Sequence, residues 1–145
     1  MSQNRIDSFR DAYRFLSNFF PAEVSYEGAI YPSVENAFQA AKCVDVSERT
    51  VFAVCSPAEA KRFGRRVRLR PDWEQVKLNI MHQLVTDKFT RSDELRRRLL
   101  ATGDAELVEG NAWNDTFWGV CRGRGQNHLG RILMEVRDGL RGGSL

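Results

Sequence analysis

The sequence predicts an α+β fold, a single compact helix-rich domain with a small β-sheet, that covers residues 1–145. Its 145 residues, 42% of them hydrophobic, suffice for one core and are too few to suggest a second domain. Apolar residues recur at helical spacing through most of the chain, and strand-like alternation is confined to short stretches. No internal repeat or low-complexity tract divides the chain, and only residues 142–145 look like a frayed tail.

The first predicted element is a short β-hairpin over residues 24–31, "VSYEGAIY". Apolar side chains alternate on both sides of the pair Glu27-Gly28, which is a typical turn sequence. We therefore expect the small sheet near the N-terminus.

The pattern becomes helical after Pro32, where Ser33 is placed to cap a helix. The apolar stripe of this helix consists of Val34, Ala37, Phe38, Ala41 and Val44. A second helix follows at residues 56–64.

This second helix has a complete start and stop pattern. Ser56 is placed as the cap, Pro57 follows at the first helical position, and Glu59 completes a capping box. Gly64 is expected to end the helix.

Residues 72–89 predict the central helix, with Asp72 as its cap and Gln75 three positions later. Its apolar stripe consists of Trp73, Val76, Ile80, Met81 and Leu84. A further helix from Ser92 to about Thr102 has acids first and arginines later, the order that the helix dipole favours.

The C-terminal part begins with two segments that look extended, residues 105–111 and 115–121, with a polar turn between them. The last predicted helix covers residues 127–140. Its core-facing residues are Leu129, Ile132, Leu133, Val136 and Leu140.

Positive charge is concentrated in residues 61–70, "KRFGRRVRLR", although the formal net charge of the whole chain is only +3. This run predicts either a solvated arginine-rich surface or a site that attracts phosphates. Aromatic residues are not interleaved with the cations, so a dedicated groove for single-stranded nucleic acid is not indicated.

Neither a membrane span nor a metal site is expected. The longest apolar stretches are too short to cross a bilayer, and charges interrupt the N-terminal segment, so we expect a cytoplasmic protein. Cys43, Cys55 and Cys121 contain no CxxC pair, and only His82 and His128 could join them as ligands. We expect reduced thiols and no structural zinc.

No cofactor fingerprint is complete. In residues 119–130, "GVCRGRGQNHLG", His128 stands where a dinucleotide-binding loop needs its third glycine, and Gly130 comes too late. A P-loop and a GxSxG elbow are also missing from the sequence. We therefore expect no cofactor, with water as the co-substrate.

Three polar residues on the helix after Pro32 lie at the edge of its apolar stripe. Glu35 and Lys42 are seven positions apart, so they point within about 20° of one another and lie roughly 10.5 Å apart along the axis, with Gln39 between them. Such a face could hold a sugar ring between an acid and an amine. From the spacing alone, ordinary boundary charges on a surface helix are the favoured interpretation.

Four blocks in the same order resemble the NADAR family, also called the YbiA-like family. The first, "RFLSNFFPAEVSYEGAIYPSVENAFQAAK" at residues 14–42, is similar to the opening signature of that family. Further blocks are residues 60–77, 99–120 and 125–137, with Met81 and Lys88-Phe89 between them. The likeness covers nearly the whole chain and implies a NADAR-like fold.

The resemblance implies an N-glycoside hydrolase that cleaves the bond between ribose C1 and a nitrogen. Two substrates fit the family: ribosylamino-pyrimidine phosphates of riboflavin synthesis, which we favour, and ADP-ribosylated guanine in DNA or a nucleoside. A non-catalytic module that binds ADP-ribose or NAD derivatives is the alternative of another class. The expected partner is therefore a small phosphorylated ribosyl-base, and a nucleic acid is not required; the oligomeric state is not indicated.

The resemblance also implies catalytic roles for three residues. Glu35 occupies the motif glutamate position and is assigned the main acid/base role. Lys42 is the motif lysine, whose neutral amine could form a Schiff base with the sugar. Asp115 matches the acid before a Trp-Gly pair, where it could orient water or bind ribose hydroxyls; an acid in an Asx-turn is the structural alternative.

Further residues are assigned to substrate binding: Asn18, Gln39, Arg66, Trp73, Trp118 and Asn127. The indole rings could stack on a base, although core packing is the alternative for each, and Asn127 could instead cap the last helix. Asn36 departs from the family signature, where histidine is common, and such a departure is expected to alter substrate choice and not reaction type.

Overall fold

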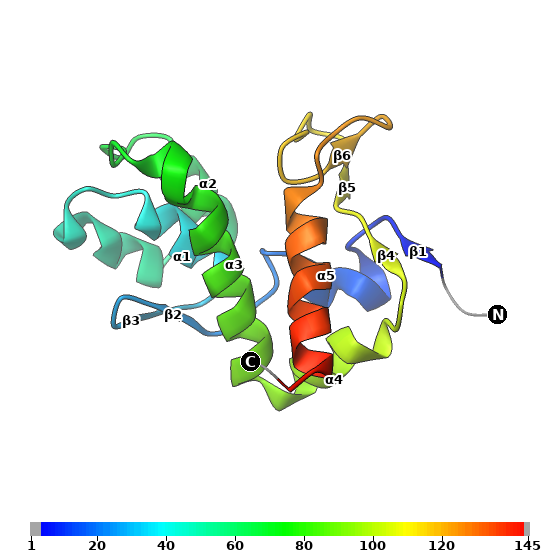
Figure 1. Ribbon diagram of the computed structural model, residues 1–145. Helices are drawn as coiled ribbons and strands as arrows, with labels where there is room; N and C mark the ends of the chain where they lie inside the picture. Colours follow the sequence, from blue (N-terminus) through cyan, green and yellow to red (C-terminus); the bar gives the residue numbers. More distant parts are fainter. Residues whose placement is uncertain (1–3, 144–145) are drawn as a thin grey trace. The chain divides into compact units, whose positions relative to one another are not determined.

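The computed structural model describes residues 4–143 and has a helix-rich α+β fold (Figure 1). Within these residues the sheet content consists of three separate two-stranded pairings. The chain divides into two compact units: unit 2 covers Asn18–Arg91, and unit 1 combines the residues up to Ser17 with those from Ser92 onward. Of the predicted tail 142–145, residues 144 and 145 lie outside the described residues, and 142 and 143 form a turn.

Unit 2 begins with the predicted hairpin. Strand β2 (Val24–Tyr26) pairs antiparallel with β3 (Ala29–Tyr31). Glu27 and Gly28 between them both have positive φ, 46° and 87°, which is the backbone of a tight two-residue hairpin turn. The prediction of a hairpin turning at this pair is therefore confirmed.

Helix α1 (Val34–Ala41) is buried along its whole length, because α2, α3, the strand β2 and the 3-10 segment η2 (Val46–Ala53) all pack against it. Ser33 caps it as predicted, by accepting a hydrogen bond from the backbone of Asn36. Val44 lies beyond the helix and is 42% exposed, so its predicted place in the apolar stripe is wrong.

Asn36 has no contact with solvent. Its side-chain nitrogen donates to the carbonyl oxygens of Phe52 (2.9 Å) and Cys55 (2.8 Å), and its oxygen accepts from the Ser33 hydroxyl. A buried amide with both ends bonded fixes α1 against the end of η2. In this chain Asn36 therefore stabilises the packing of α1 against η2.

Helices α2 (Pro57–Phe63) and α3 (Trp73–Arg91) confirm the next two predictions. Both hydrogen bonds of the capping box at Ser56 and Glu59 are present. Before α3, the Asp72 carboxylate accepts from the Arg70 guanidinium at 2.7 and 3.1 Å. In Figure 1, α3 is the long helix of unit 2; α1 and strand β2 of the hairpin pack against it, and α2 packs against α1.

Unit 1 is built around helix α5 (His128–Arg141), which contacts both α4 (Asp93–Ala101) and β4 (Glu106–Leu107). Ser92 caps α4, and Gly103 follows it with φ 64°. Strand β4 pairs in parallel with β1 (Arg5–Ile6), and the 3-10 segment η1 (Asp11–Leu16) follows β1.

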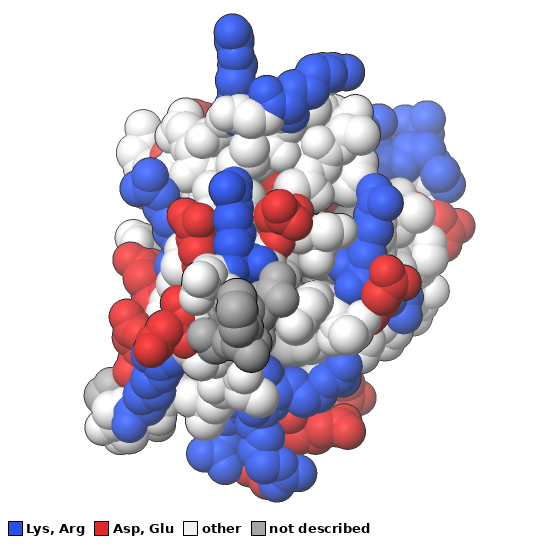
Figure 2. Space-filling model, turned by 90° about the vertical axis from the view of Figure 1, so that its right-hand side faces the viewer, with Lys and Arg blue, Asp and Glu red and all other residues white. Residues whose placement is uncertain are grey.

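The two predicted extended segments of unit 1 are mostly loop. β5 (Gly110–Asn111) pairs in parallel with β6 (Val120–Cys121), each only two residues long, and residues 112–119 between them form no strand. Figure 2 shows lysine and arginine side chains mixed with aspartate and glutamate over the face that it displays. Among residues 4–143, no helix is long and apolar enough to cross a bilayer.

Candidate active site

The candidate site in unit 2 starts from two adjacent side chains on α1. Glu35 and Gln39 are one helical turn apart and are 8% and 5% exposed. Gln39 donates from Nε2 to Oε2 of Glu35 at 2.6 Å. The prediction that these residues border the core is confirmed, and the burial is deeper than a boundary position requires.

Lys42 stands directly after the last residue of α1, and its side chain turns toward an aromatic pair. Its Nζ lies 5.9 Å from the centre of the Trp73 ring, and that ring packs 4.9 Å from Phe38. Trp73, at the start of α3, is only 6% exposed. The alternative of core packing is therefore confirmed for Trp73, and stacking of its ring on a base stays a prediction.

The environment of Lys42 lowers the pKa of its amine. Burial is the largest cause, the nearby Glu35 carboxylate acts in the opposite direction, and the cations Arg65 and Lys77 add to the lowering. A lowered pKa increases the fraction of neutral amine near neutral pH, which is the nucleophilic form. Sequence reasoning missed Lys77, although its position one turn after Trp73 places both on the same face of α3.

Asn18 is joined to the same helix. Its backbone oxygen accepts a hydrogen bond at 3.1 Å from the backbone nitrogen of Glu35, which lies in the first turn of α1. Its side-chain nitrogen faces the sulfur of Met81 at 3.6 Å. The structure thus joins the backbone of Asn18 to that of Glu35, and the role of the Asn18 side chain in substrate binding stays a prediction.

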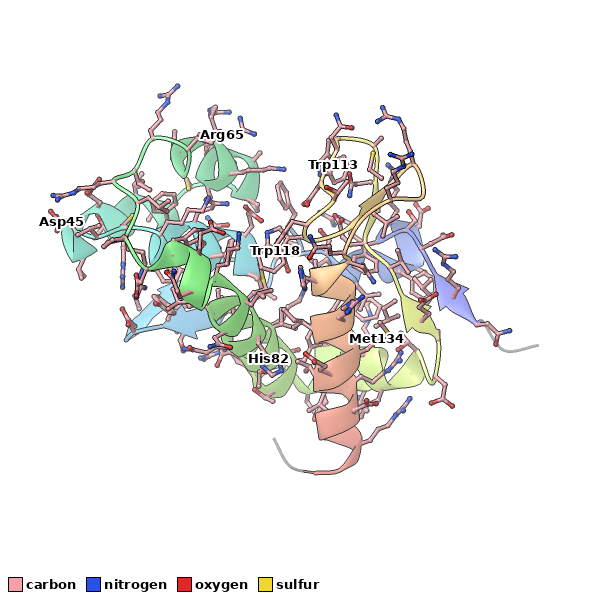
Figure 3. All side chains as sticks on the ribbon, turned by 45° about the horizontal axis from the view of Figure 1, so that its top comes forward. Asp45, Arg65, His82, Trp113, Trp118 and Met134 are labelled. Carbon is pink, nitrogen blue, oxygen red and sulfur yellow. The ribbon has the colours of Figure 1, made fainter. Side chains whose placement is uncertain are left out.

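The basic run divides into two kinds of residue. Arg70 has a structural role, because its guanidinium donates to the Asp72 carboxylate and to the Tyr26 hydroxyl, the latter at 3.3 Å. Arg65 extends outward from the segment after α2 (Figure 3), and the predicted ligand-binding residue Arg66 is exposed beside it. The exposed cations of the run are Arg62, Arg65, Arg66 and Arg68.

Asp115 belongs to unit 1 and adopts the geometry of its structural alternative. Its Oδ1 accepts from the backbone nitrogens of Phe117 (3.2 Å) and Trp118 (2.9 Å), which is an Asx-turn. The side chain of Asn111 bonds to both the backbone nitrogen and the backbone oxygen of Asp115. In the described part of the chain, the second carboxylate oxygen accepts no hydrogen bond.

Asn127 occupies the N-cap position of α5 with φ 54°, but its side chain makes no capping bond, so the alternative of a side-chain cap is wrong. Its Nδ2 donates instead to the Leu107 carbonyl at 2.9 Å, and its Oδ1 accepts from the Glu109 backbone at 3.0 Å. The left-handed backbone turns the side chain back onto the strand β4. These two bonds fix the loop before α5.

Trp118 is half-buried at the start of α5 (Figure 3). Its ring meets Phe117 edge-on at 4.8 Å, and Phe117 packs 4.5 Å from the His128 ring. Unit 1 therefore places an aromatic cluster next to the Asp115 turn. The sequence offered Trp118 as a candidate but gave no signal for the pairing with His128.

The fold is that of a known N-glycosidase. An NMR structure of the Escherichia coli protein YbiA matches with a TM-score of 0.85 and 38% identity, covering 97% of this chain and 88% of that one. The curated N-glycosidase YbiA of Escherichia coli (strain K12) is 41% identical over 137 residues, which are 92% of this chain and 85% of the relative. The prediction of an enzyme that hydrolyses N-glycosyl compounds is confirmed by these relatives.

A family model described as the NADAR domain matches residues 6–141, and the chain belongs to that family. The Riboflavin biosynthesis protein VVA0006 of Vibrio vulnificus (strain YJ016) is 40% identical over 130 residues. That match covers 87% of this chain but only 35% of the relative, so the chain corresponds to about a third of that protein.

Proposed function

We propose that the protein hydrolyses the bond between ribose C1 and nitrogen in ribosylamino-pyrimidine phosphates, the reactive intermediates of riboflavin synthesis. The observation that carries this proposal is that a buried carboxylate on α1, Glu35, lies near an amine whose pKa is lowered, Lys42, directly after the helix. The name of the Vibrio relative supports the choice of substrate class, and the family supports the reaction.

Breaking a ribosyl C–N bond builds positive charge on the sugar and negative charge on the departing nitrogen. Glu35 suits this demand, because a carboxyl group at the sugar stabilises the first charge as a carboxylate or donates a proton to the nitrogen as an acid. Burial makes either interaction stronger than it would be in water. Gln39 holds the carboxylate through the 2.6 Å bond.

Lys42 supplies the nucleophile in this proposal. Its neutral Nζ attacks ribose C1, the C1–N bond to the base breaks, and the proton from Glu35 goes to the departing nitrogen. The sugar ring then opens to give an imine between C1 and Nζ, as one Nζ proton passes to the ring oxygen and the other returns to Glu35. Water hydrolyses the imine and releases ribose phosphate and the lysine amine. The amine is regenerated, so water is the only co-substrate.

Substrate binding is assigned to Trp73 and Arg66. Trp73 offers an aromatic face beside the Lys42 amine, and Arg66 is an exposed cation for the phosphate. The roles of Asn18, Trp118 and Asn127 in binding, and of Asp115 at the ribose, stay predictions. A cytoplasmic location also stays a prediction.

The second candidate reaction is removal of ADP-ribose from guanine. The exposed arginines of residues 61–70 favour it, because they would suit a diphosphate or a nucleic-acid backbone. A module that only binds ADP-ribose is disfavoured, since a binder has no need of a buried acid next to an amine of lowered pKa.

One experiment separates these readings. The purified protein is incubated separately with the ribosylamino-pyrimidine phosphate and with ADP-ribosylated guanosine, and the free base is measured. We expect release from the first substrate, and release from the second alone would favour the alternative. Binding of either compound without release by the wild-type protein would contradict both.

The same assay on Glu35→Gln tests the mechanism. We expect base release to fall by roughly 10³-fold, with ligand binding within a few-fold, because the substitution removes the proton chemistry and keeps the shape. Glu48→Gln, an exposed glutamate of the same unit, is the matched control and should keep full activity.

A further inference from the structure

Gly64, directly after α2, lies so close to Gln39 of α1 that a side chain at position 64 would displace the Gln39 amide. A Cβ atom added to Gly64 would lie 1.9 Å from Oε1 and 2.7 Å from Cδ of Gln39, far inside van der Waals contact. The backbone of Gly64 is ordinary and right-handed, with φ −61° and ψ −18°. Glycine is therefore needed at this position for space and not for conformation.

The Gln39 amide has an orientation that one neighbour dictates. Nε2 donates to the Glu35 carboxylate, and Oε1 is buried with no hydrogen-bond partner in the described structure. The Glu35 oxygen accepts this hydrogen bond, and only the nitrogen of an amide can donate one, so the amide turns its nitrogen to Glu35 and its oxygen to Gly64. An unsatisfied buried oxygen is costly, so the bond to Glu35 outweighs that cost in this arrangement.

We propose that Gly64 and Gln39 act as positioning residues for the catalytic carboxylate. Gly64 leaves the space that holds the Gln39 amide in one place, and Gln39 fixes Glu35 at the reacting sugar. This inference rests on the proposed catalytic role of Glu35. It replaces the predicted direct contact of Gln39 with substrate.

The decisive variant is Gly64→Ala. The new methyl group displaces the far end of a flexible side chain, and alanine is compatible with the backbone at this position, so the fold is retained. We expect kcat to fall about 10- to 100-fold, the scale for losing a hydrogen bond to a charged group, with KM within about threefold. A KM increase at constant kcat would instead assign Gln39 to substrate binding and overturn the proposal.

A double-mutant cycle tests whether the effect passes through Gln39. Gln39→Ala alone should lower kcat by a similar factor, because it removes the same bond to Glu35. Adding Gly64→Ala to Gln39→Ala should then change kcat less than about twofold, since the displaced amide no longer exists. Additive losses would mean that Gly64 acts on the fold in another way, and the proposal would be wrong.

Two controls separate the failures. Gly103→Ala introduces a strained residue at φ 64° with no atom within 4 Å, so it should lower stability without lowering kcat at a temperature where it is folded. If Glu35→Gln keeps wild-type activity, the proposed function fails together with this inference. If Glu35→Gln is inactive and Gly64→Ala is fully active, only the positioning role fails.

Discussion

The polar residues of the two units are used in different ways. In unit 2, Glu35 is bonded to another side chain, Gln39, and Lys42 lies among an aromatic ring and two cations. In unit 1, Asp115 and Asn127 are bonded chiefly to backbone atoms of their own loops. By residue type alone, each of these four side chains could take part in catalysis or substrate binding.

This difference in bonding partners helps to distinguish side chains with a chemical role from side chains that stabilise the fold. A side chain that satisfies backbone nitrogens and carbonyls is doing what any ordered loop requires. Glu35 is instead a buried acid that accepts from the amide of another side chain, and the amine near it has a pKa lowered by burial. This contrast supports the proposal that the bond-breaking chemistry belongs to unit 2.

Of the variants that test this contrast, Lys42→Arg is expected to have the largest effect. Arginine keeps the positive charge but cannot form an imine, so kcat should fall by about 100-fold or more, and borohydride should no longer trap an adduct. In the wild type, the trapped fraction should increase as pH rises through the lowered pKa of Lys42, because the amine becomes neutral. Mass spectrometry of the reduced protein measures both outcomes.

The matched control is Lys61→Arg, a lysine of α2 outside the proposed chemistry. It should leave trapping and kcat unchanged within about twofold. If an adduct is still trapped in Lys42→Arg, the imine forms on another amine. The assignment of the nucleophile to unit 2 would then lose its support.

The second prediction compares one buried cation from each unit. Burial lowers the pKa of Lys88, on α3, to about 7, whereas Arg137 of α5, which donates to the Thr102 hydroxyl at 2.8 Å, stays charged at neutral pH. Between about pH 7 and 10, native Lys88 is mostly neutral while the unfolded chain still binds the proton, so wild-type stability rises with pH through this group.

Lys88→Met should therefore be more stable than the wild type at pH 7, by on the order of 3 kcal/mol, and this advantage should shrink toward pH 10. Arg137→Met should change stability by an amount independent of pH in the same window. Urea unfolding at several pH values measures both differences. A constant difference for Lys88→Met would show that its amine does not titrate there.

The third prediction tests the structural reading of Asp115. Asp115→Ala removes the acceptor for two backbone nitrogens and should lower the free energy of unfolding by about 1–2 kcal/mol. Asp115→Asn keeps an acceptor oxygen and should be stable within about 0.5 kcal/mol. If the Asp115 carboxylate also binds the ribose, kcat of Asp115→Asn should fall about 10-fold. Wild-type kcat in this variant would mean that Asp115 acts only in the turn.

The smallest effect is expected at two helix caps, one in each unit. Ser56 caps α2 and Ser92 caps α4, each by accepting from the backbone nitrogen three positions later at 3.1 Å. Replacing either by alanine should cost about 1 kcal/mol of unfolding free energy, with kcat unchanged within twofold. A loss of kcat for Ser56→Ala alone would mean that the placement of α2, which precedes Gly64, is tuned for catalysis.

Local features of the fold were predictable because they depend on neighbours in the sequence. The hairpin turn at Glu27-Gly28 and the caps at Ser33 and Ser56 follow from turn preferences and capping patterns. Periodicity placed Glu35 and Gln39 together at the edge of the core, but not their full burial. The family signature added the reaction class. These inferences need only a few consecutive residues or an ordered set of motifs.

Other features were decided by contacts between residues far apart in the chain. Nothing local indicated that Gly64 is a spacer for Gln39, that Asn36 bonds to the end of η2, or that Asn127 turns away from capping its helix. The sequence by itself determined which side chains carry acid, amine and aromatic groups, and which helices present them. Only the tertiary structure decided which of these groups bond to backbone and which to each other, because hydrogen bonding and steric exclusion depend on distances that sequence separation does not set.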